Sequence, residues 1–112
     1  LVFVLMARAY KNAKVDLTST DVTALYTCPS ITVAIVTSIL VSEDSGNADT
    51  ITVTLTNAAT AVFSLYKVKA VSANTTVELL TRPLVVQESE ILKVKAATAD
   101  RLHVVASLLE LS

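Results

Sequence analysis

Apolar and polar residues alternate along most of the chain with a period of two, which is typical of β-strands that bury one face. The alternation is clearest after the only glycine, where Ile51, Val53 and Leu55 alternate with threonines. No segment shows the 3.6-residue period of a long helix. The pattern predicts about eight short strands among nine candidate segments, residues 14–17, 22–27, 33–42, 50–56, 62–68, 76–80, 84–86, 91–96 and 102–109.

Turn residues separate these segments at the spacing expected of a single antiparallel β-sandwich, jelly-roll-like or Ig-like. The strongest turn signal is residues 43–49, which hold Gly46 together with Asn47, Asp44 and Asp49. Pro29 and Pro83 stop two of the predicted strands, because proline cannot donate to a ladder. With one glycine in the whole chain, the other turns are expected to depend on Asn, Asp, Ser and Pro.

The predicted domain organisation is one β-sandwich over residues 11–112, preceded by residues 1–10 as an N-terminal arm or a non-native extension. An apolar run, residues 1–5, stands before Met6, which could be the natural start. This run is too short for the core of a signal peptide and has no basic region before it. We favour a non-native extension, and the alternative is an arm that docks on a neighbouring molecule.

The composition indicates a protein that buries apolar surface against a partner. Hydrophobic residues make up 53% of the chain and charged residues 17%, fewer than in ordinary soluble domains. We therefore expect a homo-oligomer or an assembly subunit. The net charge is −1 and basic residues form no stripe, which disfavours nucleic acid as a partner. No apolar run is long enough to span a membrane as a helix.

Two strands show apolar residues on both faces, which suggests where a partner binds. In residues 33–42, Val33, Ile35, Ile39 and Val41 share one parity and are expected to fill the core. The opposite parity is mixed, and the last strand shows the same feature. On the assumption that the first parity is internal, the candidate interface residues are Val36, Leu40, Val105, Leu109 and Leu111.

No pattern predicts a catalytic, cofactor-binding or metal-binding residue. His103 is the only histidine and lies inside an apolar strand, so a surface or interface position is expected rather than a catalytic one. Cys28 has no basic neighbour in sequence and is expected to be a buried, inert thiol. Phosphate-binding and dinucleotide-binding loops are excluded, because both need several glycines.

Two acidic clusters could either bind or react with a ligand or lie in solvent as ordinary surface charges. Glu43, Asp44 and Asp49 share a turn but lack the spacing of a calcium loop, so a solvated acidic turn is expected. Glu88 and Glu90 could act as paired carboxylates. They stand two residues apart near Lys93, which favours a surface charge cluster.

Several segments, taken in order, resemble small β-sandwich virion proteins of tailed bacteriophages, of the decoration or cement kind. The resemblance is carried by residues 25–29, 33–42, 49–55, 84–94 and 100–111, and covers nearly all of the chain after Met6. That group usually has glycines in the turn after the proline and before the penultimate strand. Here residues 30–32 and 88–90 contain none.

The resemblance implies a structural protein of the virion and not an enzyme. The favoured hypothesis is a capsid decoration subunit that forms a trimer, binds the major capsid protein and bridges capsomers on the capsid surface. One alternative is a tail, neck or fibre component of the virion. A carbohydrate-binding adhesion module is a third hypothesis, disfavoured because the chain has no Trp and only three Tyr. The resemblance implies no catalytic residue and no cofactor.

Overall fold

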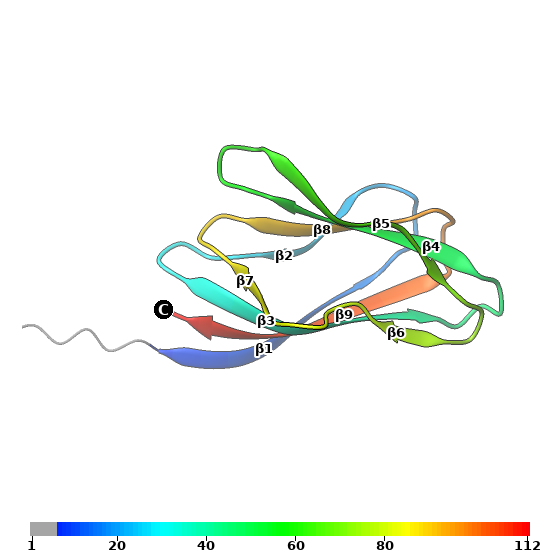
Figure 1. The fold of residues 1–112 in the computed structure, drawn as a ribbon, viewed down its shortest axis with the longest axis horizontal. Helices are drawn as coiled ribbons and strands as arrows, with labels where there is room; N and C mark the ends of the chain where they lie inside the picture. Colours follow the sequence, from blue (N-terminus) through cyan, green and yellow to red (C-terminus); the bar gives the residue numbers. More distant parts are fainter. Residues whose placement is uncertain (1–6) are drawn as a thin grey trace, which may run out of the picture.

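A computed structural model describes residues 7–112 as two antiparallel β-sheets packed face to face (Figure 1). The predicted all-β sandwich is confirmed, and the part of the chain that the structure describes contains no helix. It therefore holds no helical segment able to cross a membrane. The strands are β1 (Arg8–Asp16), β2 (Thr23–Thr27), β3 (Val33–Glu43), β4 (Asp49–Thr56), β5 (Val62–Val71), β6 (Thr76–Glu78), β7 (Leu84–Val86), β8 (Ile91–Ala96) and β9 (Leu102–Leu111).

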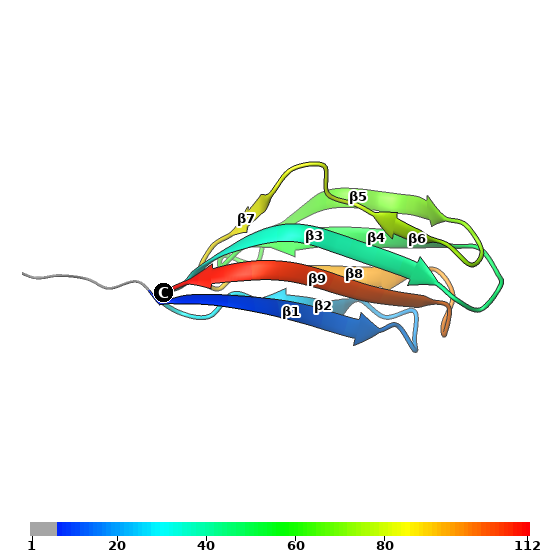
Figure 2. The ribbon, with the colours of Figure 1, turned by 90° about the horizontal axis from the view of Figure 1, so that it is seen from below.

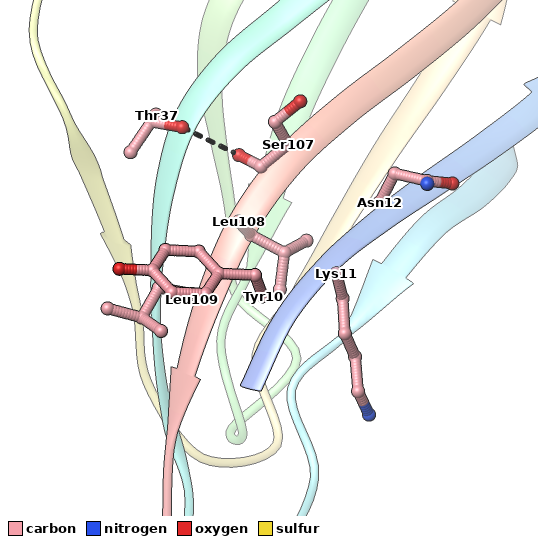
Figure 3. Close-up of a pocket in the computed structure, with 7 residues that line it drawn as sticks. All are labelled: Tyr10, Lys11, Asn12, Thr37, Ser107, Leu108 and Leu109. Carbon is pink, nitrogen blue, oxygen red and sulfur yellow. Dashed lines mark hydrogen bonds between the residues drawn. The ribbon is translucent and has the colours of Figure 1, made fainter. Parts of the chain in front are cut away.

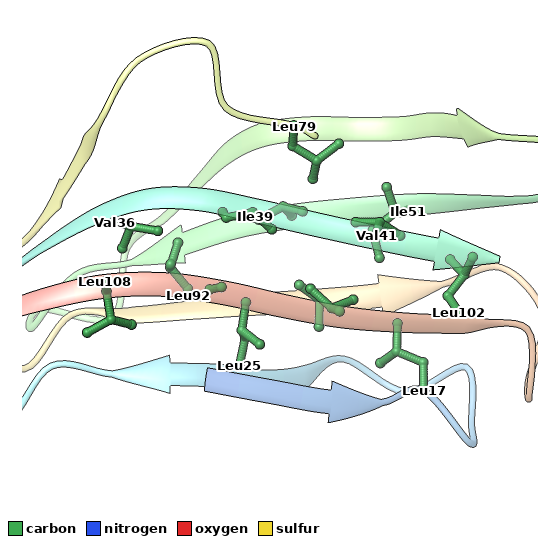
Figure 4. Packing of buried hydrophobic residues seen from close by; sticks show 14 of the residues in the cluster. Leu17, Leu25, Val36, Ile39, Val41, Ile51, Leu79, Leu92, Leu102 and Leu108 are labelled. Atoms are coloured by element: carbon green, nitrogen blue, oxygen red, sulfur yellow. The ribbon is translucent and has the colours of Figure 1, made fainter. Parts of the chain in front are cut away.

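The two sheets divide the strands unequally. Sheet A has the order β1-β9-β3-β6, with β7 pairing beside β6 along the same edge of β3, and sheet B has the order β2-β8-β4-β5. Branched aliphatic side chains fill the space between them (Figure 4). Leu92 and Val94 from β8 and Ile51 from β4 meet Ile39 and Val104 from sheet A, each with no exposed surface. Burial of these apolar side chains is the main favourable term for the fold.

The first strand starts earlier than the sequence pattern indicates. β1 begins at Arg8, which pairs with Leu111, so the predicted domain boundary between residues 10 and 11 falls inside this strand. The strand lies at the edge of sheet A, and its residues are exposed or half-buried. An edge strand of this kind needs no strict apolar alternation. Residues 1–6, which include the apolar run of residues 1–5 and Met6, lie outside the described residues, whereas residues 8–10 of the predicted extension belong to β1.

A β-bulge divides β3 into two halves with opposite parity. The register with β9 shifts between Val36, which pairs with Leu108, and Ser38, which pairs with Ser107. Thr37 is the extra residue, and a bulge of this kind exchanges the faces on which later side chains lie. Before the bulge the even-numbered Val36 is internal, and after it the odd-numbered Ile39 is internal.

The turns depend on left-handed backbone conformations that glycine does not supply. Gly46 has a φ of 82°, but six other residues also have positive φ: Ile31, Thr60, Val68, Asn74, Ser89 and Asp100. Ile31 and Ser89 lie in the two turns that lack the expected glycines. Asn and Asp tolerate this conformation, whereas β-branched residues such as Ile31 are strained in it. Asn, Asp and Ser residues therefore account for only some of the left-handed conformations, and β-branched residues adopt the others.

Strand β5 forms an irregular edge of sheet B. Its register with β4 shifts twice, between Ile51 and Val53 and again between Val53 and Thr54. Val68 has a φ of 52° at the first of these irregularities, and its N–H is bound by Oγ1 of Thr52 at 3.1 Å. The hydrogen-bonded pairing of β5 with β4 is therefore interrupted twice, and bulges of this kind increase the local twist of the strand.

Candidate interaction surface

The outer face of sheet A carries an apolar row that crosses four strands. Tyr10 of β1 pairs with Leu109 of β9, Leu109 pairs with Ile35 of β3, and Ile35 pairs with Val85 of β7. We call these four residues the apolar row. Residues that pair directly in antiparallel strands point to the same side, so the four side chains form one stripe. The exposed fraction is 86% for Tyr10 and 51% for Val85.

A second row lies further along the strands and ends in opposite charges. Lys14 of β1 pairs with Val105 of β9, Val105 pairs with Leu40 of β3, and Leu40 pairs with Glu78 of β6. We call these four residues the charged row. Its two central side chains are apolar and its ends carry a cation and an anion. Val105 and Leu40 are exposed to 36% and 39%, so apolar surface continues along the face.

A shallow hollow of about 350 Å³ lies beside the apolar row (Figure 3). Its lining includes Tyr10 and Asn12 of β1, Ser107 and Leu109 of β9, and Thr37 of the bulge. Oγ1 of Thr37 donates a hydrogen bond of 3.2 Å to the carbonyl oxygen of Ser107. The hollow therefore has hydroxyl groups between apolar walls. Lys11 is the one charged residue in its lining, and its ammonium group pairs with Glu110, so the convergent charged groups that a reaction would require are not assembled in it.

His103 lies on the same outer face, between two aspartates. Its Nε2 is 3.2 Å from Oδ1 of Asp16, and its Nδ1 is 3.6 Å from Oδ2 of Asp44. All three side chains are substantially exposed. A protonated His103 would make ion pairs with both carboxylates, which are weak in water. Ser42 is the cross-strand neighbour of His103, but its hydroxyl is hydrogen-bonded to Oγ1 of Thr76 at 2.9 Å. Within residues 7–112 no hydrogen bond joins it to the histidine, so this cluster lacks the nucleophile–base contact of acyl transfer.

A nearly buried carboxylate lies on the opposite, inner side of sheet A. Glu110 of β9 is 8% exposed. Its Oε1 lies 2.8 Å from Nζ of Lys11, and its Oε2 accepts a hydrogen bond of 2.5 Å from the hydroxyl of Tyr26. The hydrogen bonds from Lys11 and Tyr26 lower the pKa of Glu110 and outweigh its burial. Burial, followed by the bond to Glu110, raises the pKa of Tyr26.

Four of the five predicted interface residues lie on the outer face. Leu40, Val105, Leu109 and Leu111 all point away from the core, as their strand pairings and partial exposure show. Val36 does not, since it is fully buried between the sheets. The assumption that one parity of residues 33–42 fills the core is wrong, because the bulge at Thr37 exchanges the two faces.

Three residues of the apolar row were missed by the sequence analysis. Ile35 was assigned to the core by the same parity error. Tyr10 precedes the predicted start of the domain, and Val85 belongs to a strand of only three residues. The alternation on either side of Thr37 was the signal that could have found Ile35, had it been interpreted separately for each half of the strand.

Cys28, Asp49 and Glu90, singled out in the sequence, make hydrogen bonds within the fold. Cys28 is 1% exposed, and its Sγ lies 3.4 Å from the carbonyl oxygen of Thr32. Burial raises the pKa of this thiol, which disfavours the reactive thiolate.

The acidic residues of the two clusters differ in their contacts. Oδ2 of Asp49 accepts a hydrogen bond of 3.1 Å from the N–H of Thr98. Glu88 is exposed, whereas Oε1 of Glu90 accepts a hydrogen bond of 2.7 Å from the N–H of Gln87.

The buried carboxylate of Glu43 holds the turn between β3 and β4 by hydrogen bonds to its backbone. Its Oε1 accepts hydrogen bonds from the backbone N–H groups of Gly46 and Asn47, both at 3.0 Å, and of Asn74 at 3.2 Å. Its Oε2 binds the N–H of Ser45 at 2.7 Å. Burial alone would raise the pKa of Glu43, but a hydrogen bond of 2.5 Å from the Ser45 hydroxyl, together with these backbone bonds, lowers it to about 2. Residues 7–112 contain no group of three His, Cys, Asp or Glu side chains placed to hold a metal ion.

Comparison with known proteins shows a likeness of fold only. No family model matches the chain, and no curated protein matches it. A solved structure of a Bacillus endospore appendage, described as forming a novel family of disulfide-linked pili, superimposes with a TM-score of 0.50 at 8% sequence identity. The match covers 96% of this chain and 85% of the appendage chain. At this identity the likeness supports the β-sandwich and carries no function by itself.

Proposed function

We propose that this chain is a structural subunit of a bacteriophage virion, and that it decorates the capsid surface by bridging capsomers. The observation that carries the proposal is the outer face of sheet A. Apolar side chains there run across four strands although a complete core already lies between the sheets. A monomeric domain rarely exposes a continuous apolar stripe, and such stripes are typical of interaction sites.

The physical argument rests on contact area and rigidity. A capsid filled with DNA is under internal pressure, which tends to separate neighbouring capsomers. A small sandwich with a rigid outer face adds contacts across a junction and so opposes that separation. Leu40, Val105, Leu109 and Leu111 supply part of the apolar contact, and the resemblance to phage decoration proteins supports the same function.

Binding to capsids tests this proposal. The protein is mixed with empty capsids assembled from the major capsid protein encoded in the same genome, and bound protein is measured by sedimentation and by electron microscopy. We expect binding at a copy number comparable to that of capsomers or their junctions. Leu109→Asp is the matched variant that should bind weakly. Absence from capsids, together with a few copies per particle at the tail or neck, would refute decoration in favour of a tail component.

A second candidate is a subunit of an extracellular filament, and the fold likeness to an endospore appendage pilus favours it. The appendages are described as disulfide-linked, whereas the single cysteine here, Cys28, is 1% exposed. Residues 7–112 therefore could not link subunits by disulfides without uncovering Cys28. Electron microscopy of the concentrated protein distinguishes the two candidates, because a filament subunit forms fibres without any capsid.

A further inference from the structure

The rows on the outer face of sheet A have ends that complement one another. The charged row begins with Lys14 on β1 and ends with Glu78 on β6. The apolar row begins with Tyr10 on β1 and ends with Val85 on β7. Since β6 and β7 both pair with β3, the β1 side and the β6–β7 side are opposite margins of one face (Figure 2). The arrangement of charged and apolar side chains on this face is therefore complementary to itself after a twofold rotation.

We infer that this face binds the same face of a second copy of this chain, about a twofold axis that runs along the strands between β9 and β3. Such an axis brings β9 over β3 and places β1 over the margin formed by β6 and β7. Sheets that stack face to face lie about 10 Å apart with roughly aligned strands. A twofold interface of this kind is isologous, so each contact occurs twice.

The contacts that result are favourable in both rows. In the charged row, Lys14 of each copy lies opposite Glu78 of the other, and Val105 lies opposite Leu40. In the apolar row, Leu109 lies opposite Ile35 and Tyr10 lies opposite Val85. Beyond the apolar row, the pair Leu111 and Val33 also face each other. Charge complementarity at the margin and apolar contact at the centre are the usual arrangement of a specific interface.

The other twofold arrangement fits the same face less well. An axis perpendicular to the strands would place the apolar row over the charged row. Arg8 would then lie opposite Asp16, which is favourable, but Val85 would lie opposite Glu78 and Val33 opposite Ser42. A carboxylate placed against an apolar side chain loses its hydration and gains no opposing cation. The axis along the strands avoids this mismatch.

Glu78 is held in place before any partner binds. Its Oε2 accepts hydrogen bonds from the backbone N–H groups of Ile39 at 2.8 Å and Leu80 at 3.2 Å, and its Oε1 accepts one from the hydroxyl of Ser38. The carboxylate is therefore fixed at the margin while the residue stays exposed. A charge ordered in advance loses less entropy on binding. The inference does not depend on the virion proposal, because the dimer needs no capsid; the dimer would have to dissociate before the same face could contact capsomers.

The experiment uses complementary charge reversals and analytical ultracentrifugation. Lys14→Glu and Glu78→Lys each place like charges at both margins, so each variant alone should dissociate with a Kd at least about tenfold higher than that of the native dimer. Mixed together, the two variants should form a heterodimer of nearly native affinity, since each margin again joins a cation to an anion. Arg8→Glu, on the same face but outside the charged row, should leave dimerisation unchanged.

The possible results separate clearly. A native monomer or trimer overturns the inference, as does a mixture of the two variants that stays monomeric while both are folded. Sensitivity to Arg8→Glu in place of Lys14→Glu overturns it in favour of the perpendicular axis. If Glu78→Lys fails to fold, Tyr10→Cys and Val85→Cys are mixed with a short bismaleimide cross-linker. A cross-link formed only between the two variants supports the face-to-face dimer, and its absence overturns it.

Discussion

The hydroxyl of Tyr26 donates a 2.5 Å hydrogen bond to Oε2 of Glu110, which joins β2 of sheet B to β9 of sheet A. The second oxygen of the same carboxylate lies 2.8 Å from Nζ of Lys11 on β1. One nearly buried anion therefore connects three strands across the two layers. Contacts of this kind fix how one sheet sits on the other, which apolar packing alone determines less uniquely.

Removing the Tyr26 hydroxyl should lower the free energy of unfolding. Tyr26→Phe leaves a carboxylate oxygen of Glu110 without its donor, and we expect a loss of about 1–2 kcal/mol. Urea unfolding at neutral pH measures it. Tyr10→Phe is the matched control, because Tyr10 is 86% exposed and should change stability little. Equal stabilities for the two variants would contradict a structural role for the Tyr26–Glu110 bond.

Glu43 should make stability depend on pH in the acid range. Its pKa is lowered to about 2 from the ordinary value of 4.5, so the folded state binds this proton less readily than the unfolded state. The stabilisation is fully present above pH 4.5 and is lost as pH falls toward 2. Glu43→Gln should therefore be less stable than the native protein at pH 7, with a difference that shrinks between pH 4.5 and 2. Urea unfolding across this range, with the exposed Glu88→Gln as control, tests it; a difference independent of pH would count against it.

Relieving backbone strain at Ile31 should stabilise the protein. Ile31 has a φ of 55° and its side chain is 82% exposed, so it gains little from packing. Because glycine adopts this conformation without a clash, Ile31→Gly should raise the free energy of unfolding by about 1 kcal/mol despite the added freedom of the unfolded chain. Thr32→Gly, at a neighbouring residue without positive φ, should destabilise. Thermal unfolding of both variants decides; a lower Tm for Ile31→Gly would argue against strain.

Substitutions at two adjacent leucines on β9 should distinguish an effect on association from an effect on folding. Leu109 lies on the outer face, and Leu109→Asp should abolish assembly while changing the stability of the monomer by less than about 1 kcal/mol. Leu108 is 3% exposed, and Leu108→Asp buries an unpaired charge that should cost at least about 3 kcal/mol. Light scattering measures assembly and circular dichroism measures folding. Normal assembly of Leu109→Asp would remove this residue from the interface.

Deleting the bulge residue should leave the fold intact. Without Thr37, Val36 and Ser38 become adjacent and still pair with the adjacent residues Leu108 and Ser107. The internal residues on both sides of the deletion then follow one regular alternation. We expect the Thr37 deletion to fold with a loss of a few kcal/mol at most. Deletion of Leu40 instead exchanges the faces of Val41 and Glu43 and should unfold the protein. Circular dichroism of the two deletions compares them directly.

The strands with one buried face could be predicted from sequence because alternation reports burial directly. Residues 84–86 and 91–96 match β7 and β8, and the alternating Leu92 and Val94 of β8 are internal. The start of β1 could not be found, because an edge strand exposed along most of its length has no apolar periodicity to detect. The bulge at Thr37 was visible only as an interruption, so its effect on the two faces was missed.

The interaction surface was predicted in part for the same reason. Leu109 and Val105 lie on a regular strand, where parity is reliable over the whole length. The apolar row, however, depends on the register of four strands that are distant in sequence. Pairing such as that of Ile35 with both Leu109 and Val85 is set by the tertiary fold, and a single sequence does not contain it in a local pattern.

The irregular edge formed by β5 bears on how this protein avoids misassembly. An incoming chain that tried to extend sheet B there would meet two breaks in register, a left-handed residue at Val68, and the ammonium groups of Lys67 and Lys69. Bulges and edge lysines of this kind block amyloid-like growth. Strand β1, by contrast, pairs with β9 without interruption over nine residues. Strand β1 therefore depends on charge alone, from Arg8, Lys11, Lys14 and Asp16, to prevent an incoming strand from extending sheet A.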